Sequence, residues 1–191
     1  MEHKWPTYEV APDDSIHALG VVSINYARFE RTNVWMLCAV ANMSEEHASA
    51  IIPSVNTIDR IKLIKTFLGR KTDWPSDGLT AIRHYLKAME ILVANRNVLM
   101  HSNLIRGTEN RTAVYSNGKR GQNLFQVELS EIRQVADDLN NYFYFGLNVS
   151  NVIATEIHLM ARTEGMLAIS QWPELLPLPV HIDPSQRKKS S

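Results

Sequence analysis

Apolar side chains recur at helical spacing along most of this chain, most clearly in the stretch 78–105. With residues placed about 100° apart around a helix axis, one narrow sector of this stretch collects a stripe of apolar side chains. They are Ile82, Leu86, Met89, Val93, Met100 and Leu104. We therefore expect a long helix over 78–105 whose stripe faces a core.

The same spacing predicts the other helices. A first long helix should run from about residue 14 to 43. A second segment should begin at Ser44 and be interrupted at Pro53, which cannot continue a helix, before the helical pattern resumes and stops at Gly69. A last long helix should begin at Ser130, and Gly146 and Ser150 in its apolar stripe would let another helix approach closely.

Ahead of that last helix the period changes from helical to alternating. Residues 111–116 and 123–129 alternate as strands do, and Asn117-Gly118 between them is typical of a tight turn. We therefore expect a small β-hairpin over about 108–129. Its basic residues would cluster near the end of the 78–105 helix, either as a substrate-facing or dimer-facing arm or as a solvated charged turn. They are Arg106, Arg111, Lys119 and Arg120.

Together these elements predict an all-α fold, a four-to-five-helix up-down bundle with the hairpin inserted before the last helix. The helical domain should cover 14–168, after an extended N-terminal arm over 1–13. Residues 169–191 are rich in proline, so this tail should be extended, with its Leu and Val side chains docked on the bundle.

Composition narrows the range of functions. Hydrophobic residues make up 45% of the 191 residues, which is typical of a globular domain. Lys+Arg of 20 against Asp+Glu of 20 argues against nucleic-acid binding by bulk charge, so any such contact needs a local patch or a dimer cleft. The single cysteine, Cys38, excludes a disulfide within the chain, and no apolar run is long enough for a membrane span. We expect a cytoplasmic protein without membrane contact.

Three polar side chains interrupt the apolar pattern near the end of the 78–105 helix. Asn97 falls inside the stripe, and Arg96 and His101 lie on its two flanks, both on the inward half. Burying such groups without partners costs a few kcal/mol each. They either form a structural network that caps or bridges the helix end, or they converge on a ligand. The sequence shows no metal-ligand spacing and no nucleotide-binding loop, so we expect no metal and no cofactor.

The pattern Arg96-Asn97-x-x-x-His101 resembles the motif of the HEPN superfamily, the higher eukaryotes and prokaryotes nucleotide-binding domain. In that family an arginine, then typically Asn, Asp or His, precedes a histidine at the end of a long helix. The resemblance implies an all-α bundle and, in many members, a metal-independent ribonuclease of toxin or phage-defence type. It also implies that two motifs meet across a homodimer, with RNA or a nucleotide as ligand and an antitoxin or regulatory protein as a further partner.

An acidic residue on the first helix bears on the same site. Glu30 falls in the middle of the apolar face of that helix, between Tyr26 and Asn33, where an acid is costly unless it is paired. Several HEPN families place an acidic residue opposite the motif, so the resemblance implies that Glu30 pairs with Arg96. The sequence equally allows Glu30 to turn outward, since Arg28 and Arg31 lie close by.

Three functions follow. The first is a dimeric HEPN-like ribonuclease in which His101 is general base or acid, Arg96 holds the phosphate, and Asn97 orients His101 or donates to the phosphate. The second is a HEPN-like domain that only binds a nucleotide, a nucleic acid or a protein. The third is a helical interaction module in which the three polar residues are structural. The first needs exposed Arg96 and His101 that point into a shared cleft, and a monomer with an open pocket at the motif would favour the second. Full burial of both residues, with Glu30 closing the ion pair, would favour the third.

Overall fold

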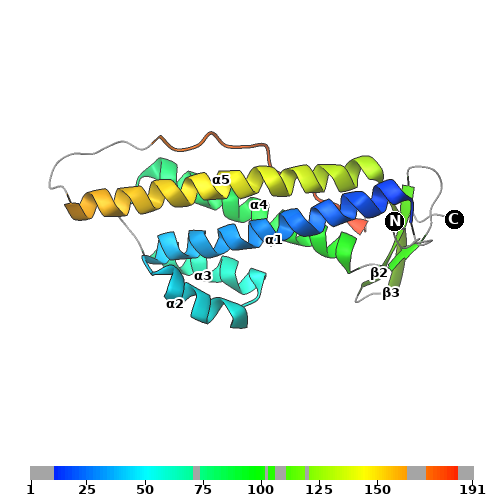
Figure 1. Cartoon of the computed structure of the whole chain (residues 1–191), viewed down its shortest axis with the longest axis horizontal. Coiled ribbons are helices and arrows are strands. Elements are labelled where there is room, and N and C mark those ends of the chain that lie inside the picture. Colours follow the sequence, from blue (N-terminus) through cyan, green and yellow to red (C-terminus); the bar gives the residue numbers. More distant parts are fainter. Residues whose placement is uncertain are drawn as a thin grey trace, which may run out of the picture.

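The structure, a computed structural model, describes residues 11–70, 74–101, 103–105, 111–118, 121–162 and 171–184. It contains five α-helices in these parts of the chain, together with the short 3-10 helix η1 (Ile52–Ser54) and a small sheet (Figure 1). The α-helices are α1 (Asp13–Ala41), α2 (Glu45–Ile51), α3 (Thr57–Gly69), α4 (Ser76–Met100) and α5 (Leu129–Arg162). The expected helical bundle with strands inserted before the last helix is confirmed.

The two longest helices, α1 and α5, lie side by side. Both begin at the end of the bundle that carries the sheet, so they run in the same direction, while α4 runs the opposite way (Figure 1). Their shared core includes Tyr26 and Met36 of α1 and Leu139 of α5, all of them buried. Tyr85 of α4 sits at the centre, within 5.8 Å of the Phe29 ring, measured between ring centroids. This aromatic packing fixes α4 against α1.

The short segments between α1 and α4 follow the capping rules. The Ser44 hydroxyl accepts the backbone N–H of His47 at 3.3 Å and so caps α2. Pro53 lies in η1, where the predicted interruption occurs, and α3 begins at Thr57 with Asn56 as its cap. The interruption returns the chain toward α1, so that the first turn of α3 packs beside Tyr26.

The sheet has a third strand that the sequence did not predict. Strands β1 (Asn103–Ile105), β2 (Arg111–Gly118) and β3 (Gly121–Glu128) are antiparallel, in the order β1-β2-β3. The prediction that the helix continues to residue 105 is wrong: α4 ends at Met100, and Leu104 pairs with Val114 of β2. A run of only a few apolar residues fits a helical and a strand pattern equally well. Residues 103–105 form a strand because they pair with β2.

The hairpin is confirmed, but its turn lies further along the chain than predicted. Pairing continues through Asn117 and reaches Gly118, which faces Gly121. The strands therefore stay paired through Asn117-Gly118, where the sequence predicts the turn, and the chain reverses only beyond Gly118.

The C-terminal segment 171–184, which we call the strap, lies along the bundle beside α4 and α5 (Figure 1). Leu176 and Leu178 pack against the core, as the docking of the tail predicts, and Ile182 is 3% exposed. The Val180 side chain, in contrast, is 77% exposed, and Val180 is held by its backbone carbonyl, which accepts a hydrogen bond from the Asn95 side chain. The strap is held by its backbone as much as by its apolar side chains.

Two buried tyrosines make the fold sensitive to alkali. Burial raises the pKa of Tyr142 from 10.0 to about 12, with the charge of Asp138 as a second cause, and burial also raises the pKa of Tyr85 well above its ordinary value. A raised pKa in the folded state means that the stability contribution is complete below pH 10 and is lost as the pH rises toward about 12. We expect the free energy of unfolding to fall across this window in denaturant titrations followed by circular dichroism. A Tyr142→Phe protein should show a shallower fall, and equal slopes for the two proteins would contradict this assignment.

No helix in the parts of the chain that the structure describes is both long and apolar enough to cross a membrane.

Candidate functional site

The end of α4 brings the three motif residues together. His101 follows the last helical residue, and its backbone N–H donates to the carbonyl of Asn97 at 3.0 Å. Nη1 of Arg96 lies 2.7 Å from Nε2 of His101 and 3.1 Å from Oδ1 of Asn97. The helix end thus folds the arginine back over both of its motif partners.

The contact between Arg96 and His101 defines a protonation state. A guanidinium group has only donors, so Nε2 of His101 must accept and carries no proton. His101 is therefore neutral in this arrangement, with its proton on Nδ1. Its side chain is exposed, so a ligand can reach the ring.

Arg96 is half-buried and lies on an aromatic surface. Its guanidinium carbon is 4.8 Å from the centroid of the Tyr26 ring, a cation–π distance, and Nε is buried without a hydrogen-bond partner among the described residues. In the same parts of the chain, no carboxylate forms an ion pair with Arg96. Within the described structure the site therefore keeps one positive charge that no acidic side chain compensates, beside an accessible neutral histidine.

The structure gives Glu30 neither of the partners considered from sequence. Its carboxylate accepts the Thr57 hydroxyl at 2.7 Å and lies 3.8 Å from Nη1 of Arg60, both on α3. The expected pairing with Arg96 is thus wrong. Arg60 is the nearer cation because it is anchored to the carbonyl of Val55 at 2.9 Å, and α3 packs directly on α1.

Glu30 and Arg96 nevertheless share a neighbour, Tyr26. The Tyr26 hydroxyl lies 3.4 Å from the Thr57 hydroxyl, which in turn donates to Glu30. Burial raises the pKa of Tyr26; the hydrogen bond with Thr57 lowers it, the charge of Glu30 raises it and that of Arg96 lowers it. Tyr26 therefore lies between the acid on α1 and the cation on α4, and Arg96 has no carboxylate partner in the part of the chain that the structure describes.

The hairpin cations are only partly placed. Arg111 pairs with Glu128 in the backbone register, at the end of the hairpin next to α5, and its side chain is not among those that the structure describes. Arg106, Lys119 and Arg120 lie outside the described residues. Position 118 is seven residues from Arg111, about 23 Å along an extended strand, and the predicted cluster of the four cations falls outside the described residues.

A buried polar residue was missed from sequence. Asn97, placed inside the apolar stripe by the predicted spacing, is exposed, whereas Asn95 is 0% exposed. The Asn95 amide donates to the carbonyl of Val180 and accepts the N–H of Ile182, both at 2.8 Å. Leu92 and Leu99, at positions three before and four after Asn95, already indicated in the sequence that Asn95 faces inward.

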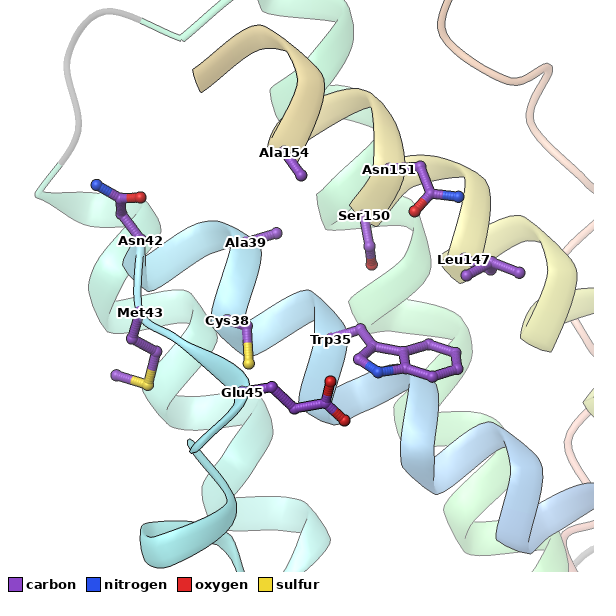
Figure 2. Close-up of a pocket in the computed structure, with 10 residues that line it drawn as sticks. All are labelled: Trp35, Cys38, Ala39, Asn42, Met43, Glu45, Leu147, Ser150, Asn151 and Ala154. Atoms are coloured by element: carbon purple, nitrogen blue, oxygen red, sulfur yellow. The ribbon is translucent and has the colours of Figure 1, made fainter. Parts of the chain in front are cut away.

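A separate hollow of about 630 Å³ lies between the C-terminal half of α1 and α5 (Figure 2). Small side chains, among them Ala39 and Ala154, leave the space open. Burial raises the pKa of Cys38 in its wall, so the thiol is protonated at neutral pH and a poor nucleophile. The hollow carries no motif residue.

Across the described parts of the chain, no three His, Cys, Asp or Glu side chains gather closely enough to hold a metal ion. Comparisons with protein families, with curated proteins and with solved structures find no match to this chain. The HEPN resemblance therefore rests on the motif residues and on the helical architecture alone.

Proposed function

We propose that this protein is a HEPN-like endoribonuclease of toxin or phage-defence type, metal-independent as the resemblance implies, that acts through Arg96 and His101. The observation that carries the proposal is the 2.7 Å contact between an accessible, neutral histidine and a guanidinium that pairs with no carboxylate among the described residues. Phosphodiester cleavage needs a cation for the phosphate and a base for the attacking hydroxyl. A buried structural network would have neutralised Arg96 with a carboxylate and covered His101.

Substrate binding would rearrange the pair. A phosphate oxygen accepts a stronger, charge-assisted hydrogen bond from Arg96 than the neutral imidazole does. When Arg96 turns to the phosphate, the lone pair on Nε2 of His101 becomes free. The phosphate thereby both occupies the cation and releases the base, while the Tyr26 ring continues to support the guanidinium.

The reaction follows from these positions. The ribose 2′-hydroxyl attacks the adjacent phosphorus and gives its proton to Nε2 of His101. The P–O5′ bond breaks, and the 5′-oxygen leaves with a proton from His101 of the partner subunit, in its imidazolium form, across a homodimer cleft. The products are a 2′,3′-cyclic phosphate end and a 5′-hydroxyl end. Asn97 lies exposed beside Arg96, and in this proposal its amide nitrogen donates to the phosphate.

A second candidate is a HEPN-like domain that binds a nucleotide, RNA or a regulatory protein without cleaving. The observation that favours it is that Arg96 occupies the basic nitrogen of His101 in the free protein. If a ligand does not displace this contact, the site holds an anion and performs no chemistry.

Product analysis distinguishes the two. We expect the wild-type protein to cleave a labelled single-stranded RNA in the presence of a metal chelator and to leave 2′,3′-cyclic phosphate ends. An oligonucleotide of the same sequence with 2′-deoxyribose at the cleavage position should bind and remain intact, because it lacks the nucleophile. If the protein binds both oligonucleotides and cleaves neither, the proposed nuclease activity is wrong and the protein is a binding domain.

A further inference from the structure

A second, basic hollow of about 320 Å³ lies between α3 and α4. Four charged and exposed side chains line it, namely Lys65 of α3 and Arg83, Lys87 and Glu90 of α4. Three of the four are cations, so the hollow carries an excess of positive charge in a chain whose formal net charge is +0. A local patch of this kind is what nucleic-acid binding requires when the chain as a whole is neutral.

The cations of the hollow differ in their partners. Nζ of Lys65 lies 2.6 Å from Oε1 of Glu90, so this pair bridges the two helices and its charges offset each other. Neither Arg83 nor Lys87 forms an ion pair with a carboxylate among the described residues. These two lie one helical turn apart on α4, so their charges can meet neighbouring phosphates of one strand.

The two unpaired cations share a face of α4 with the candidate site. At about 100° per residue, the exposed side chains of Arg83, Lys87, Asn97 and His101 fall within a sector about 80° wide. The backbone N–H of His101 donates to the carbonyl of Asn97, so position 101 still follows the helix. Along the axis, His101 lies about 21 Å from Lys87 and about 27 Å from Arg83. A strand that is bound at the motif and lies along this face therefore reaches both cations.

Helix α3 spans the same distance beside α4. At its start, the Thr57 hydroxyl contacts the hydroxyl of Tyr26, whose ring supports Arg96, and near its end Leu68 lines the hollow. From Thr57 to Leu68 the helix advances about 17 Å, and from Leu86 in the hollow to Arg96 helix α4 advances about 15 Å. The two helices thus hold the hollow and the motif at a fixed separation.

The lining of the hollow favours a polyanion over a small ligand. Exposed, flexible cations hold one isolated phosphate weakly, whereas on a strand the release of counterions from several phosphates adds up. The remaining described lining residues, Leu68, Gly69 and Leu86, provide neither an aromatic ring nor a hydrogen-bonding side chain to read a base. Contacts with phosphates position a strand without selecting its sequence.

We propose that Arg83 and Lys87 form a second contact for the RNA strand that is cleaved at Arg96 and His101, and that they bind phosphates several nucleotides from the scissile bond. This inference rests on the proposed function and adds that the substrate is a strand long enough to reach from the motif to the hollow. A dinucleotide held at the motif does not touch the hollow. The second contact thus contributes to affinity for long RNA and takes no part in the chemistry.

The test replaces both unpaired cations in the full chain, as Arg83→Gln and Lys87→Gln together. For single strands, each neutralised phosphate contributes about 0.7 to the slope of log affinity against log salt, so for an RNA of about 15 nucleotides the slope of this variant should be shallower by about 1.4. The advantage of the wild type then shrinks about 2.6-fold for each doubling of salt. Binding is measured with RNA that carries 2′-deoxyribose at the cleavage position. Cleavage is measured with the unblocked RNA, where KM should rise and kcat should stay unchanged, and with a dinucleotide.

Glu90→Gln should give the opposite change at the same place. It removes the carboxylate that neutralises Lys65 and so leaves a third unpaired cation at the hollow. The variant should bind the long RNA more tightly than the wild type, with a salt slope steeper by about 0.7. Weaker binding by Glu90→Gln would contradict the second contact, because a strand at the hollow is attracted by Lys65 and repelled by Glu90.

The matched control removes two cations from other helices, as Arg31→Gln on α1 and Arg133→Gln on α5. Both side chains are exposed and pair with carboxylates, Arg31 with Glu45 at 3.7 Å and Arg133 with Asp14 at 3.6 Å. The control changes the net charge by the same amount as the double variant and should leave the salt slope nearly unchanged. All the substituted positions are exposed, so the circular dichroism melting curves of every variant should stay close to that of the wild type.

The outcomes separate this inference from the proposed function. A shallower salt slope in the double variant with unchanged dinucleotide cleavage supports the second contact. An unchanged slope, or an equal change in the control, overturns it and leaves the nuclease standing. Equal losses on the long RNA and on the dinucleotide also overturn it, since the cations would then act through the motif. If the long RNA binds with the expected slopes but is not cleaved, the second contact holds and the nuclease falls. If the wild-type protein neither binds nor cleaves RNA, both fall.

Discussion

We expect His101→Ala to lower the rate of chelator-resistant RNA cleavage by about 10²- to 10⁴-fold, the range that loss of a general acid or base produces. The reason lies in the geometry, because Nε2 of His101 is the only nitrogen of the motif that can accept a proton. Arg96 has donors alone, and the Asn97 amide nitrogen is not basic. The measurement is the initial rate with labelled RNA at saturating substrate, so that kcat is compared.

The variant should remain folded, which makes the result interpretable. The His101 side chain is exposed and follows the last turn of α4, and its backbone N–H, which the substitution keeps, closes that turn. Exposed substitutions away from special features change stability by about 0.5 kcal/mol or less. Near-identical circular dichroism melting curves are expected. Marked destabilisation without a loss of specific cleavage would instead make the Arg96–His101 contact structural.

Asn97→Ala provides the matched comparison on the same helix turn. It removes the 3.1 Å contact with Arg96 while leaving the Arg96–His101 contact in place. Its expected effect on kcat is smaller than that of His101→Ala, because no proton transfer depends on it. An equal or larger loss would assign the main role to the amide and move His101 to a supporting one.

The sequence predicts the helices well because their apolar stripes are long. Over α1 and α5 the inward spacing repeats for many turns, and tertiary packing agrees with it. The end of α4 is harder because Asn95, Arg96 and Asn97 are adjacent and point in three directions around the axis. A small error in the assumed centre of the apolar stripe is enough to assign the inward position to the wrong asparagine. The sequence prediction placed Asn97 inside the stripe, whereas Asn95 is the buried residue and Asn97 is exposed.

The partner of a polar side chain is harder to predict from sequence than the helix that carries it. Glu30 could be recognised as an acid on an inward face, but its partner depends on where α3 returns to α1. That return is set by η1 and by the contacts of Arg60 with the carbonyls of Val55 and Ile52, which no helical pattern encodes. The strap illustrates the same limit. Its prolines predict an extended chain, whereas its path follows from the contacts of Asn95 with Val180 and of Gly78 with Trp172, which lie far apart in the sequence.

The close packing of α1, α4 and α5 predicts the second large effect, a loss of stability in Gly146→Ala. A Cβ at this position would lie 2.7 Å from Cγ2 of Thr32 and would overlap the ring of Tyr85. The ring cannot move aside easily, because it is fully buried and its hydroxyl donates to Asn33. Overpacking of this kind costs about 1–3 kcal/mol, and the better helix propensity of alanine offsets about 1 kcal/mol at most.

Gly20→Ala is the matched control, because Gly20 lies within α1 and a Cβ there would meet no atom within 4 Å. This variant keeps the propensity gain without the clash and should be stabilised by about 0.5–1 kcal/mol. In denaturant titrations, the free energy of unfolding should therefore be lower than that of the wild type for Gly146→Ala and higher for Gly20→Ala. Stabilisation of both would mean that Tyr85 and Thr32 yield space at little cost, and that the junction of α1, α4 and α5 is looser than their contacts indicate.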